Sequence, residues 1–244
     1  MGAASAPPAP SAPPASITSP APPPAEDLIT QRARALFADA NAAWSRQFAL
    51  LGTQYPAPDL GFFTQTVQKA CGSDTPLSGP FYCPDERKVY LDRAFLQRLM
   101  EHQASPTDDA ALAYVIGHEL GHHVQSLLGT TALVAQARAR SAPAVSARTW
   151  MAAELQADCY AGIWIGGALK RGVIDSKRDL AVVLAGVAAI SQADNAHPPA
   201  RAQLPDPVLT YGSAQQRLRW LQRGVETAHI DACDTFGAEA TGKL

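Results

Sequence analysis

The sequence predicts a predominantly helical α+β fold with a small antiparallel sheet. Much of the chain after residue 25 repeats apolar residues at intervals of three and four, which places them on one face of a helix. Between residues 53 and 92 the pattern changes to short runs of aromatic and β-branched residues, separated by Gly, Pro, Ser and Asp. The 244 residues are enough for a sizeable core, and they contain no internal repeat.

Residues 1–25 differ in composition from the rest, because they hold nine of the 20 prolines and no charged residue. Proline removes backbone donors and fixes φ, so we expect an extended, solvated linker, with one folded domain over residues 26–244. The segment lacks the basic start and apolar centre of a signal peptide. Because a linker stands at this terminus, we hypothesise that a membrane anchor precedes it in the full-length protein. No run in this chain approaches the roughly 18 apolar residues of a membrane helix.

The first folded element is predicted to be an amphipathic helix over residues 26–51. Its apolar residues recur at helical spacing, and Gly52 ends it. Three short strands are predicted next, within "FFTQTVQKACG", "PFYC" and "KVYLD", and we expect them to pair as an antiparallel sheet. Helical spacing returns from Arg93 to Gln103.

The next predicted helix carries the most unusual motif of the chain. Ser105 can cap its start, Pro106 suits the first helical position, and Asp108 stands where a capping box has an acid. Gly129 is a suitable stop, so the helix has roughly 23 residues.

Three further helices are predicted in the second half of the chain. One covers about residues 145–169, after Pro143, and one covers about 176–193, capped by Ser176 or Asp175. "DNAHPPARAQLPDP" is typical of a proline-broken loop, and "GSAQQRLRWLQRG" predicts a last short helix capped by Ser213.

Charge and cysteine content limit which classes of partner and which cellular compartment are expected. The formal charge is −2 and no basic stripe is present, which argues against nucleic-acid binding. None of the four cysteines forms a Cys-x-x-Cys pair, so a structural zinc knuckle is not indicated. Their even number fits two disulfides in an oxidising compartment, and three pairings are possible. We favour Cys71 with Cys83, which closes a short loop, and Cys159 with Cys233; four buried thiols in a cytosolic protein are the alternative.

The stretch "VIGHELGHHVQ" places two histidines four residues apart in a predicted helix. His118 and His122 therefore project from one face, one turn apart, and can ligate a single zinc ion. Glu119 is close enough to address a metal-bound water without being a ligand, which is the His-Glu-x-x-His logic of two ligands and a general base. The alternative is an ordinary polar patch on a helix, and His123 is expected to be a hydrogen-bonded structural residue. His102 and His229 have no ligand spacing.

A third ligand is predicted in "ELQAD". The longer pattern His-Glu-x-x-His-x-x-Gly-x-x-His fails, because Gln125 and Leu128 stand at its last two fixed positions. Glu154 and Asp158 are four apart on a second predicted helix, so Glu154 can complete the zinc site and Asp158 can accept the free N–H of a ligating histidine. The alternative is a solvated helix face, which the apolar and small neighbours disfavour.

The motifs "GHELGHHVQ", "ELQADCYAG", "GPFYCP" with "KVYLD", and "YGSAQQRLRWLQRG" with "ACDTF" together resemble the putative neutral zinc metallopeptidase family, a gluzincin-type branch of the zincins. The similarity runs from about Phe62 to Phe236. It implies a zincin-like α+β fold, one catalytic Zn²⁺ and a peptide or protein substrate. It also implies His118, His122 and Glu154 as ligands, Glu119 as base, and the pairing of Cys71 with Cys83 and of Cys159 with Cys233.

The resemblance also bears on compartment and on the oxyanion donor. Family members often carry an N-terminal membrane segment, which together with the cysteines favours a periplasmic or other extracytoplasmic location. They usually have His-Gly-Ser/Thr where this chain has Tyr211-Gly212-Ser213. We expect the Tyr211 hydroxyl to donate to the developing oxyanion instead. His197 is a second candidate, although "AHPPA" is more typical of a loop with a surface histidine.

The sequence therefore predicts a zinc-dependent endopeptidase. An edge of the sheet near Phe81 to Tyr90 is expected to hold an extended substrate by strand addition. Arg217 could support the site from behind, but a solvated charge is the favoured interpretation. The alternatives are a non-catalytic zinc-binding recognition domain and a zinc hydrolase acting on a non-peptide amide; the sequence indicates no oligomeric state.

Overall fold

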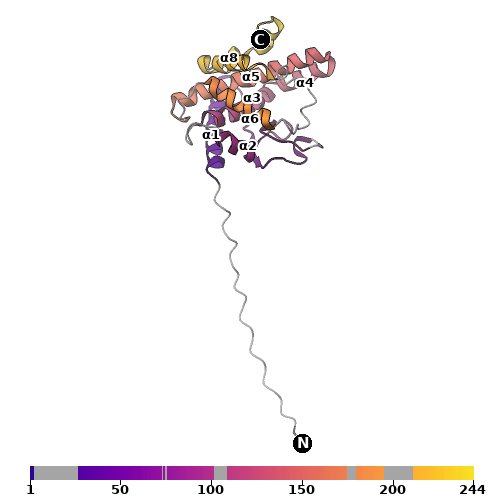
Figure 1. The fold of residues 1–244 in the computed structure, drawn as a ribbon, viewed down its shortest axis with the longest axis vertical. Coiled ribbons are helices and arrows are strands. Elements are labelled where there is room, and N and C mark those ends of the chain that lie inside the picture. Colours follow the sequence, from indigo (N-terminus) through magenta and orange to yellow (C-terminus); the bar gives the residue numbers. More distant parts are fainter. Residues whose placement is uncertain (3–26, 73, 75, 102–108, 175–179, 195–210) are drawn as a thin grey trace.

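A computed structural model describes residues 1–2, 27–72, 74, 76–101, 109–174, 180–194 and 211–244 (Figure 1). The predicted linker therefore lies almost entirely outside the described residues. The strands are β1 (Asp59–Phe63), β2 (Phe81–Cys83) and β3 (Lys88–Asp92), and short 3₁₀ turns cover Ala70–Gly72 and Ile230–Cys233. The helices are α1 (Leu28–Leu50), α2 (Arg93–Glu101), α3 (Ala110–Leu127), α4 (Thr130–Arg140), α5 (Pro143–Lys170), α6 (Leu180–Asp194), α8 (Ala214–Thr227) and α9 (Thr235–Ala240).

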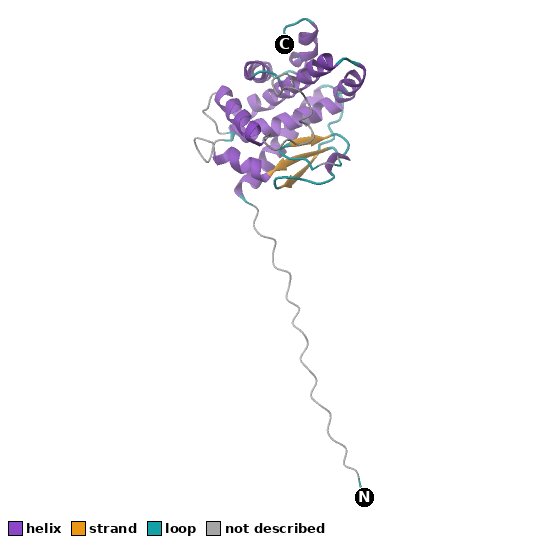
Figure 2. Ribbon diagram, turned by 45° about the vertical axis from the view of Figure 1, so that its right-hand side comes forward, coloured by secondary structure: helices purple, strands orange, loops and turns teal. Residues whose placement is uncertain are grey.

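Helix α5 lies at the centre of the fold. It packs against both α3 and α8, and α4 and α9 also contact it; Figure 1 shows α8, α5 and α3 stacked in that order. The sheet lies to one side of the helices (Figure 2), and β2 contacts α3. The main buried cluster joins Leu36 of α1, Leu91 of β3, Ile116 of α3 and Ile165 of α5. The predicted class, predominantly helical α+β, is confirmed.

The sheet is mixed, so the prediction of a wholly antiparallel sheet is wrong. The strand order is β1-β3-β2. Tyr82 of β2 faces Val89 of β3 in an antiparallel pair, whereas Leu60 of β1 faces the same residue in a parallel pair. Four residues join β2 to β3, which suits a hairpin; the longer segment 64–87 separates β1 from β3 and leaves room for a parallel return.

Strand β1 also begins earlier than the sequence predicted. It covers Asp59–Phe63, while most of "FFTQTVQKACG" lies beyond the sheet. Gln65, Lys69 and Cys71 have positive φ angles of 67°, 54° and 55°, which no strand accommodates. Phe62 and Phe63 end β1, and the residues from Thr64 to Gly72, including Thr66 and Val67, form an irregular coiled segment instead of a strand.

The predicted helices are present, with differences at their ends. Ser213 caps α8 in a capping box with Gln216, as its sequence indicates. The proposed caps at residues 105–108 and 175–176 lie outside the described residues, and Asp109 is the N-cap of α3. Helix α4 was not predicted: Gly129, at φ 81°, ends α3 and immediately precedes the new helix.

Glycines allow α5 and α8 to approach each other closely. A Cβ atom at Gly224 of α8 would clash with the carbonyl oxygen of Cys159, and one at Gly162 of α5 would clash with that of Leu221. Neither position tolerates any side chain unless the helices separate. This contact fixes α8 against the middle of α5.

Both favoured disulfides are present, so no described cysteine is free. Cys71–Cys83 ties the coiled segment after β1 to β2. Cys159–Cys233 joins α5 to the turn that precedes α9 and closes a segment of 74 residues. On the chain-entropy model a loop of that length contributes about 4 kcal/mol to the free energy of unfolding.

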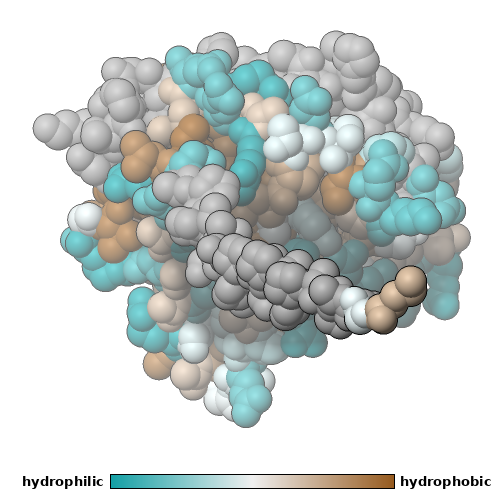
Figure 3. All heavy atoms as spheres, turned by 90° about the horizontal axis from the view of Figure 1, so that it is seen from below, coloured by the Kyte–Doolittle hydropathy of each residue, from teal (hydrophilic) through white to brown (hydrophobic). Residues whose placement is uncertain are grey.

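The surface carries no single dominant apolar region on the face in Figure 3, where hydrophobic residues form separate patches among hydrophilic ones. Scattered apolar residues of this kind are normal on folded domains. Among the described helices, none is long and apolar enough to cross a bilayer.

Gly224→Ala is expected to destabilise the protein by about 3 kcal/mol or more, because the added methyl group must push α8 away from α5. Gly186→Ala in α6 is the matched control: nothing lies within 4 Å of its added Cβ, so the better helix propensity should stabilise by up to about 1 kcal/mol. Urea denaturation measures both. Similar effects of the two substitutions would contradict the close packing of α5 on α8.

Candidate metal centre

The two histidines of the motif lie one turn apart on α3, with their ring centroids 4.8 Å apart. Gly117 and Gly121 occupy the face of α3 that meets α5. A Cβ at Gly121 would lie 2.7 Å from the Ala157 carbonyl oxygen, so only glycine permits this approach. The glycines of "GHELGHH" thus bring α5 within reach of His118 and His122.

Glu154 of α5 faces both histidines. Its Oε2 atom lies 3.2 Å from Nε2 of His118 and 3.7 Å from Nε2 of His122. Ligand atoms on a tetrahedral zinc are about 3.3 Å apart, since each bond is about 2.0–2.1 Å long. The three ligand atoms all lie within 4.8 Å of one another, and the group could hold a metal ion. The structure thus brings together the three residues predicted as ligands.

Hydrogen bonds orient both rings so that Nε2 faces Glu154. The Nδ1 of His118 lies 2.9 Å from Oδ1 of Asp158, and the Nδ1 of His122 lies 2.9 Å from Oε1 of Gln125. These acceptors require Nδ1–H, which leaves each Nε2 directed at the candidate site. The predicted contact between Asp158 and a histidine is present.

Gln125 is a site residue that the sequence reasoning missed. Its Nε2 donates to the Ala153 carbonyl at 2.7 Å and to Oε1 of Gln156 at 3.1 Å, which turns its Oε1 towards His122. Gln156 in turn donates to the Cys233 carbonyl at 3.0 Å. The only signal in the sequence is that an amide residue stands three positions after the candidate ligand His122. This spacing alone does not identify Gln125 as a site residue.

The interpretation of Arg217 as a solvated charge is wrong. Its Nε donates to Oδ2 of Asp158 at 2.9 Å and its Nη2 to Oδ1 at 3.1 Å, and only 18% of the side chain is exposed. Tyr114 completes the group, because its hydroxyl donates to Asp158 at 2.5 Å and accepts from Arg217. The position of Arg217 follows from the close contact of α8 with α5, which the sequence does not reveal.

The surrounding charges favour positive charge at the candidate site. Burial alone would raise the pKa of Glu154, but His122 and His118 hold it below its usual range. Burial would likewise raise the pKa of Asp158, and Arg217 and His118 lower it. Burial lowers the pKa of His118, but the hydrogen bonds to Asp158 and Glu154 outweigh it and raise the pKa to about 10. The same negative charges that stabilise a proton on His118 would stabilise a metal cation at this position.

Glu119 has a buried carboxylate oxygen without a partner. The residue is 7% exposed, and its Oε2 has no hydrogen-bond donor. Among the described residues, no other carboxylate oxygen is buried in this way. An unsatisfied buried acceptor is costly, so a donor such as water is expected there.

The remaining histidines do not contribute ligands among the described residues. His123 is fully buried and bonded to the Tyr82 hydroxyl at 2.9 Å and to the Pro56 carbonyl at 3.0 Å. Burial lowers its pKa to about 4, so it is neutral at pH 7. The prediction that it is structural is confirmed. His229 is exposed beside Asp231, while residues 102 and 197 lie outside the described part.

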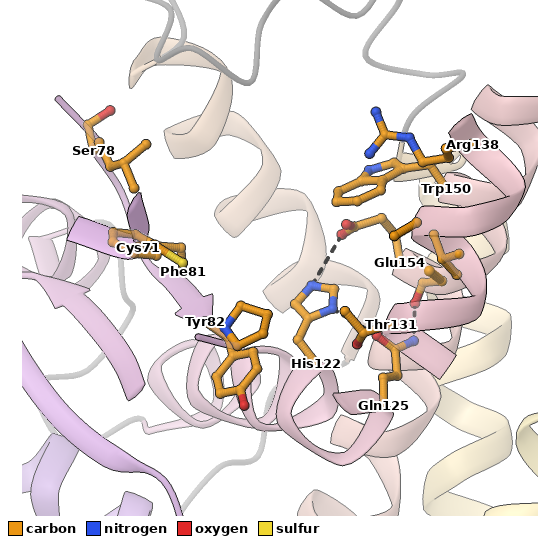
Figure 4. A pocket seen from close by; sticks show the side chains of 15 residues that line it. Cys71, Ser78, Phe81, Tyr82, His122, Gln125, Thr131, Arg138, Trp150 and Glu154 are labelled. Carbon is orange, nitrogen blue, oxygen red and sulfur yellow. Dashed lines mark hydrogen bonds and ion pairs between the residues drawn. The ribbon is translucent and has the colours of Figure 1, made fainter. Parts of the chain in front are cut away.

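A cavity of about 370 Å³ opens beside the candidate ligands, and His122 and Glu154 form part of its wall (Figure 4). Tyr211 is not among its lining residues; it directly precedes Gly212, which packs against Leu155. Tyr211 therefore lies near the residue that follows Glu154, and its role stays a prediction.

Comparison with known proteins gives a family match over most of the chain. The sequence model of the family described as "Putative neutral zinc metallopeptidase" matches residues 4–236 of this chain. Over 214 residues, the chain is 34% identical to "Uncharacterized protein YpfJ" of Escherichia coli strain K12, which covers 88% of this chain and 74% of that protein. Over 197 residues, it is 36% identical to "Uncharacterized protein Rv2575" of Mycobacterium tuberculosis strain H37Rv. This alignment covers 77% of this chain and 65% of that protein. No solved structure matches the chain significantly.

Gln125→Leu is expected to weaken zinc binding about 10–100-fold, because His122 loses the acceptor that fixes its ring. Gln125→Glu keeps an acceptor oxygen and should recover part of the affinity. Competition with a chromogenic chelator measures the dissociation constant. Gln136→Leu, at an exposed position of α4, is the control; equal affinities of the Gln125→Leu and Gln136→Leu proteins would contradict the role of Gln125.

Arg217→Leu is expected to reduce the free energy of unfolding by about 3 kcal/mol, because it removes the guanidinium that donates to both oxygens of the fully buried Asp158 carboxylate. The exposed Arg219→Leu on the same helix should change stability by less than about 0.5 kcal/mol. Urea denaturation of the metal-free proteins tests this expectation. A small effect of Arg217→Leu would show that Asp158 does not depend on the pair.

Proposed function

Because the chain belongs to the putative neutral zinc metallopeptidase family, we propose that it is a zinc-dependent endopeptidase with one zinc ion held by His118, His122 and Glu154. The observation that carries the proposal is the convergence of these three ligand atoms; Glu119 follows the ligand His118 on α3, and its Oε2 is buried with no partner among the described residues. Two imidazoles and one carboxylate leave a fourth tetrahedral position open, the arrangement of catalytic rather than structural zinc.

The residues present fit a zinc ion. Each ring has its Nδ1 bonded to an acceptor and its Nε2 towards ionised Glu154, so a zinc ion would displace the Nε2 proton of His118 and take both Nε2 atoms as ligands. When bound, zinc supplies a Lewis acid that polarises a carbonyl and lowers the pKa of a coordinated water. Arg217 and Asp158 hold His118 in place from behind the ligand shell.

Glu119 is proposed as the general base. Its free oxygen accepts a proton from the attacking water and then returns that proton to the leaving amine. The Tyr211 hydroxyl is proposed to donate to the developing negative charge on the scissile carbonyl oxygen. Tyr211 stands two residues before the Ser213 cap of α8, and its neighbour Gly212 packs against Leu155, the residue after Glu154.

Strand β2 is proposed as the edge that holds an extended substrate. The predicted range, Phe81 to Tyr90, is too wide, because β3 lies between the other two strands of the described sheet. Phe81 and Tyr82 of β2 both line the cavity, and β2 has a strand neighbour on one side only. Added pairing along β2 would place a peptide beside His122 and Glu154.

The two disulfides indicate an oxidising, extracytoplasmic environment. We further propose that the protein acts in the bacterial cell envelope, with the proline-rich segment as a tether to a preceding membrane anchor. The alternative function is a zinc-binding recognition domain that cuts nothing. A module of that kind has no use for a glutamate next to a ligand in sequence whose buried oxygen has no partner among the described residues, so Glu119 favours the enzyme.

Glu119→Gln is expected to keep one zinc ion per chain and to lower kcat/KM on an unfolded protein substrate about 10²–10⁴-fold, because the amide cannot accept the proton. Glu226→Gln, at an exposed position of α8, should match the wild type. Metal analysis and cleavage of a fluorescently labelled, unfolded protein measure both properties. Equal cleavage by wild type and Glu119→Gln would contradict the mechanism, and zinc in both with cleavage by neither would favour the recognition domain.

A further inference from the structure

The cavity beside the candidate ligands has two facing walls. Figure 4 shows Phe81 and Tyr82 with Cys71 and Ser78 on one side, and Trp150 with Arg138 above Glu154 on the other. The first wall belongs to β2 and the coiled segment that precedes it, and the second to α4 and the first half of α5. Its volume of about 370 Å³ is within the range of ligand pockets, and exceeds what one water or ion needs.

Apolar side chains make up most of the cavity surface. Leu77 and Phe81 lie on the strand side, and Val134 and Trp150 lie on the helix side. A large apolar side chain of a bound peptide can therefore enter between the two walls. Removal of such a side chain from water favours binding in proportion to the apolar area that it buries.

Arg138 introduces a charge into this apolar surface. It is the only lysine or arginine among the described lining residues, and its guanidinium lies 4.7 Å from the centroid of the Trp150 ring. A guanidinium stacked on an indole keeps the N–H donors of its edge available for a carboxylate.

The described residues provide no carboxylate for Arg138. Glu154 is the acid in the cavity wall, and it faces His118 and His122. Arg148 is different, because its Nε lies 3.0 Å from Oε1 of Glu239. The indole N–H of Trp150 is likewise buried without an acceptor. The Arg138 guanidinium and the Trp150 indole N–H therefore have no acceptor among the described residues.

We propose that Arg138, stacked on Trp150, determines substrate specificity by binding a carboxylate of the peptide whose neighbouring large apolar side chain fills the cavity. This inference rests on the proposed endopeptidase function. The carboxylate belongs either to an internal Glu or Asp of the substrate or to a chain terminus, and the chemistry at Arg138 is the same for both.

The test uses the zinc-loaded chain and fluorogenic peptides that contain one Phe. In one pair of series, Glu or Gln is placed at each position within three residues of Phe. In a second pair, the peptide ends at those positions with a free carboxylate or an amide. At one position we expect kcat/KM to be about 10–100-fold higher for the carboxylate peptide, the effect of one charged hydrogen-bonded pair. Preference in the first pair assigns an internal acid, and preference in the second assigns the terminus.

Matched variants assign the preference to one side chain. Arg138→Gln should lose the preference, so that its kcat/KM values for the charged and the neutral peptides differ by less than about twofold. Arg138→Glu should prefer a Lys peptide. Arg140→Gln removes an exposed cation of the same helix outside the cavity and should keep the preference. Circular dichroism and zinc content establish that the variants are folded and loaded.

A binding measurement separates this proposal from the endopeptidase function. Glu119→Gln holds peptides without cutting them, so fluorescence anisotropy gives their dissociation constants, with and without the Arg138→Gln substitution. Equal affinity for charged and neutral peptides, or a preference that survives Arg138→Gln, overturns the role of Arg138. A preference in binding together with no cleavage by the wild type overturns the endopeptidase function and leaves the carboxylate site.

Discussion

The close approach of α3 and α5 is the constraint on which the candidate site depends. The histidines belong to α3 and the carboxylates to α5, so the ligand atoms meet only if the helix backbones nearly touch. Gly117 and Gly121 make this possible against Ala161 and Ala157, and a methyl group at Gly121 would already contact the opposing backbone. Interior glycines cost about 1 kcal/mol each in helix propensity. Their presence within the motif is explained by packing, while the residues between them are available for chemistry.

Around this contact, most buried polar side chains have hydrogen-bond partners. Asp158 accepts from His118, from Tyr114 and from Arg217, so its carboxylate is fully bonded although it is buried. Gln125 donates from its Nε2 to the Ala153 carbonyl and accepts through its Oε1 from His122. Such networks are stable when every member is satisfied and costly when one is removed. Helix α8 is thus part of the site, since it supplies the cation that balances Asp158.

The sequence predicted the parts that depend on local spacing. Helical periodicity located α1, α5 and α8, and the four-residue spacing in two helices identified His118, His122 and Glu154 as a group that the fold does bring together. It did not predict α4, the parallel pairing of β1, or the roles of Gln125 and Arg217. These depend on which helices touch and on how the chain returns to a sheet edge, which no local pattern encodes. Arg217 shares a helix face with Trp220, Leu221 and Gly224, the buried residues of α8, but the spacing does not show which carboxylate it meets there.

Among the described carboxylates, Glu119 departs from this arrangement. Its neighbours Asp158 and Glu154 have several partners each, yet Glu119 retains a buried oxygen with none among the described residues. A domain that only stored zinc would gain stability from an apolar residue at this position, because the cost of burying an unpartnered carboxylate would disappear. Residues that violate local satisfaction persist where function requires them. Glu119 is one residue from a candidate ligand, and we expect a water or a substrate to supply the donor for its Oε2, as the proposed general base requires.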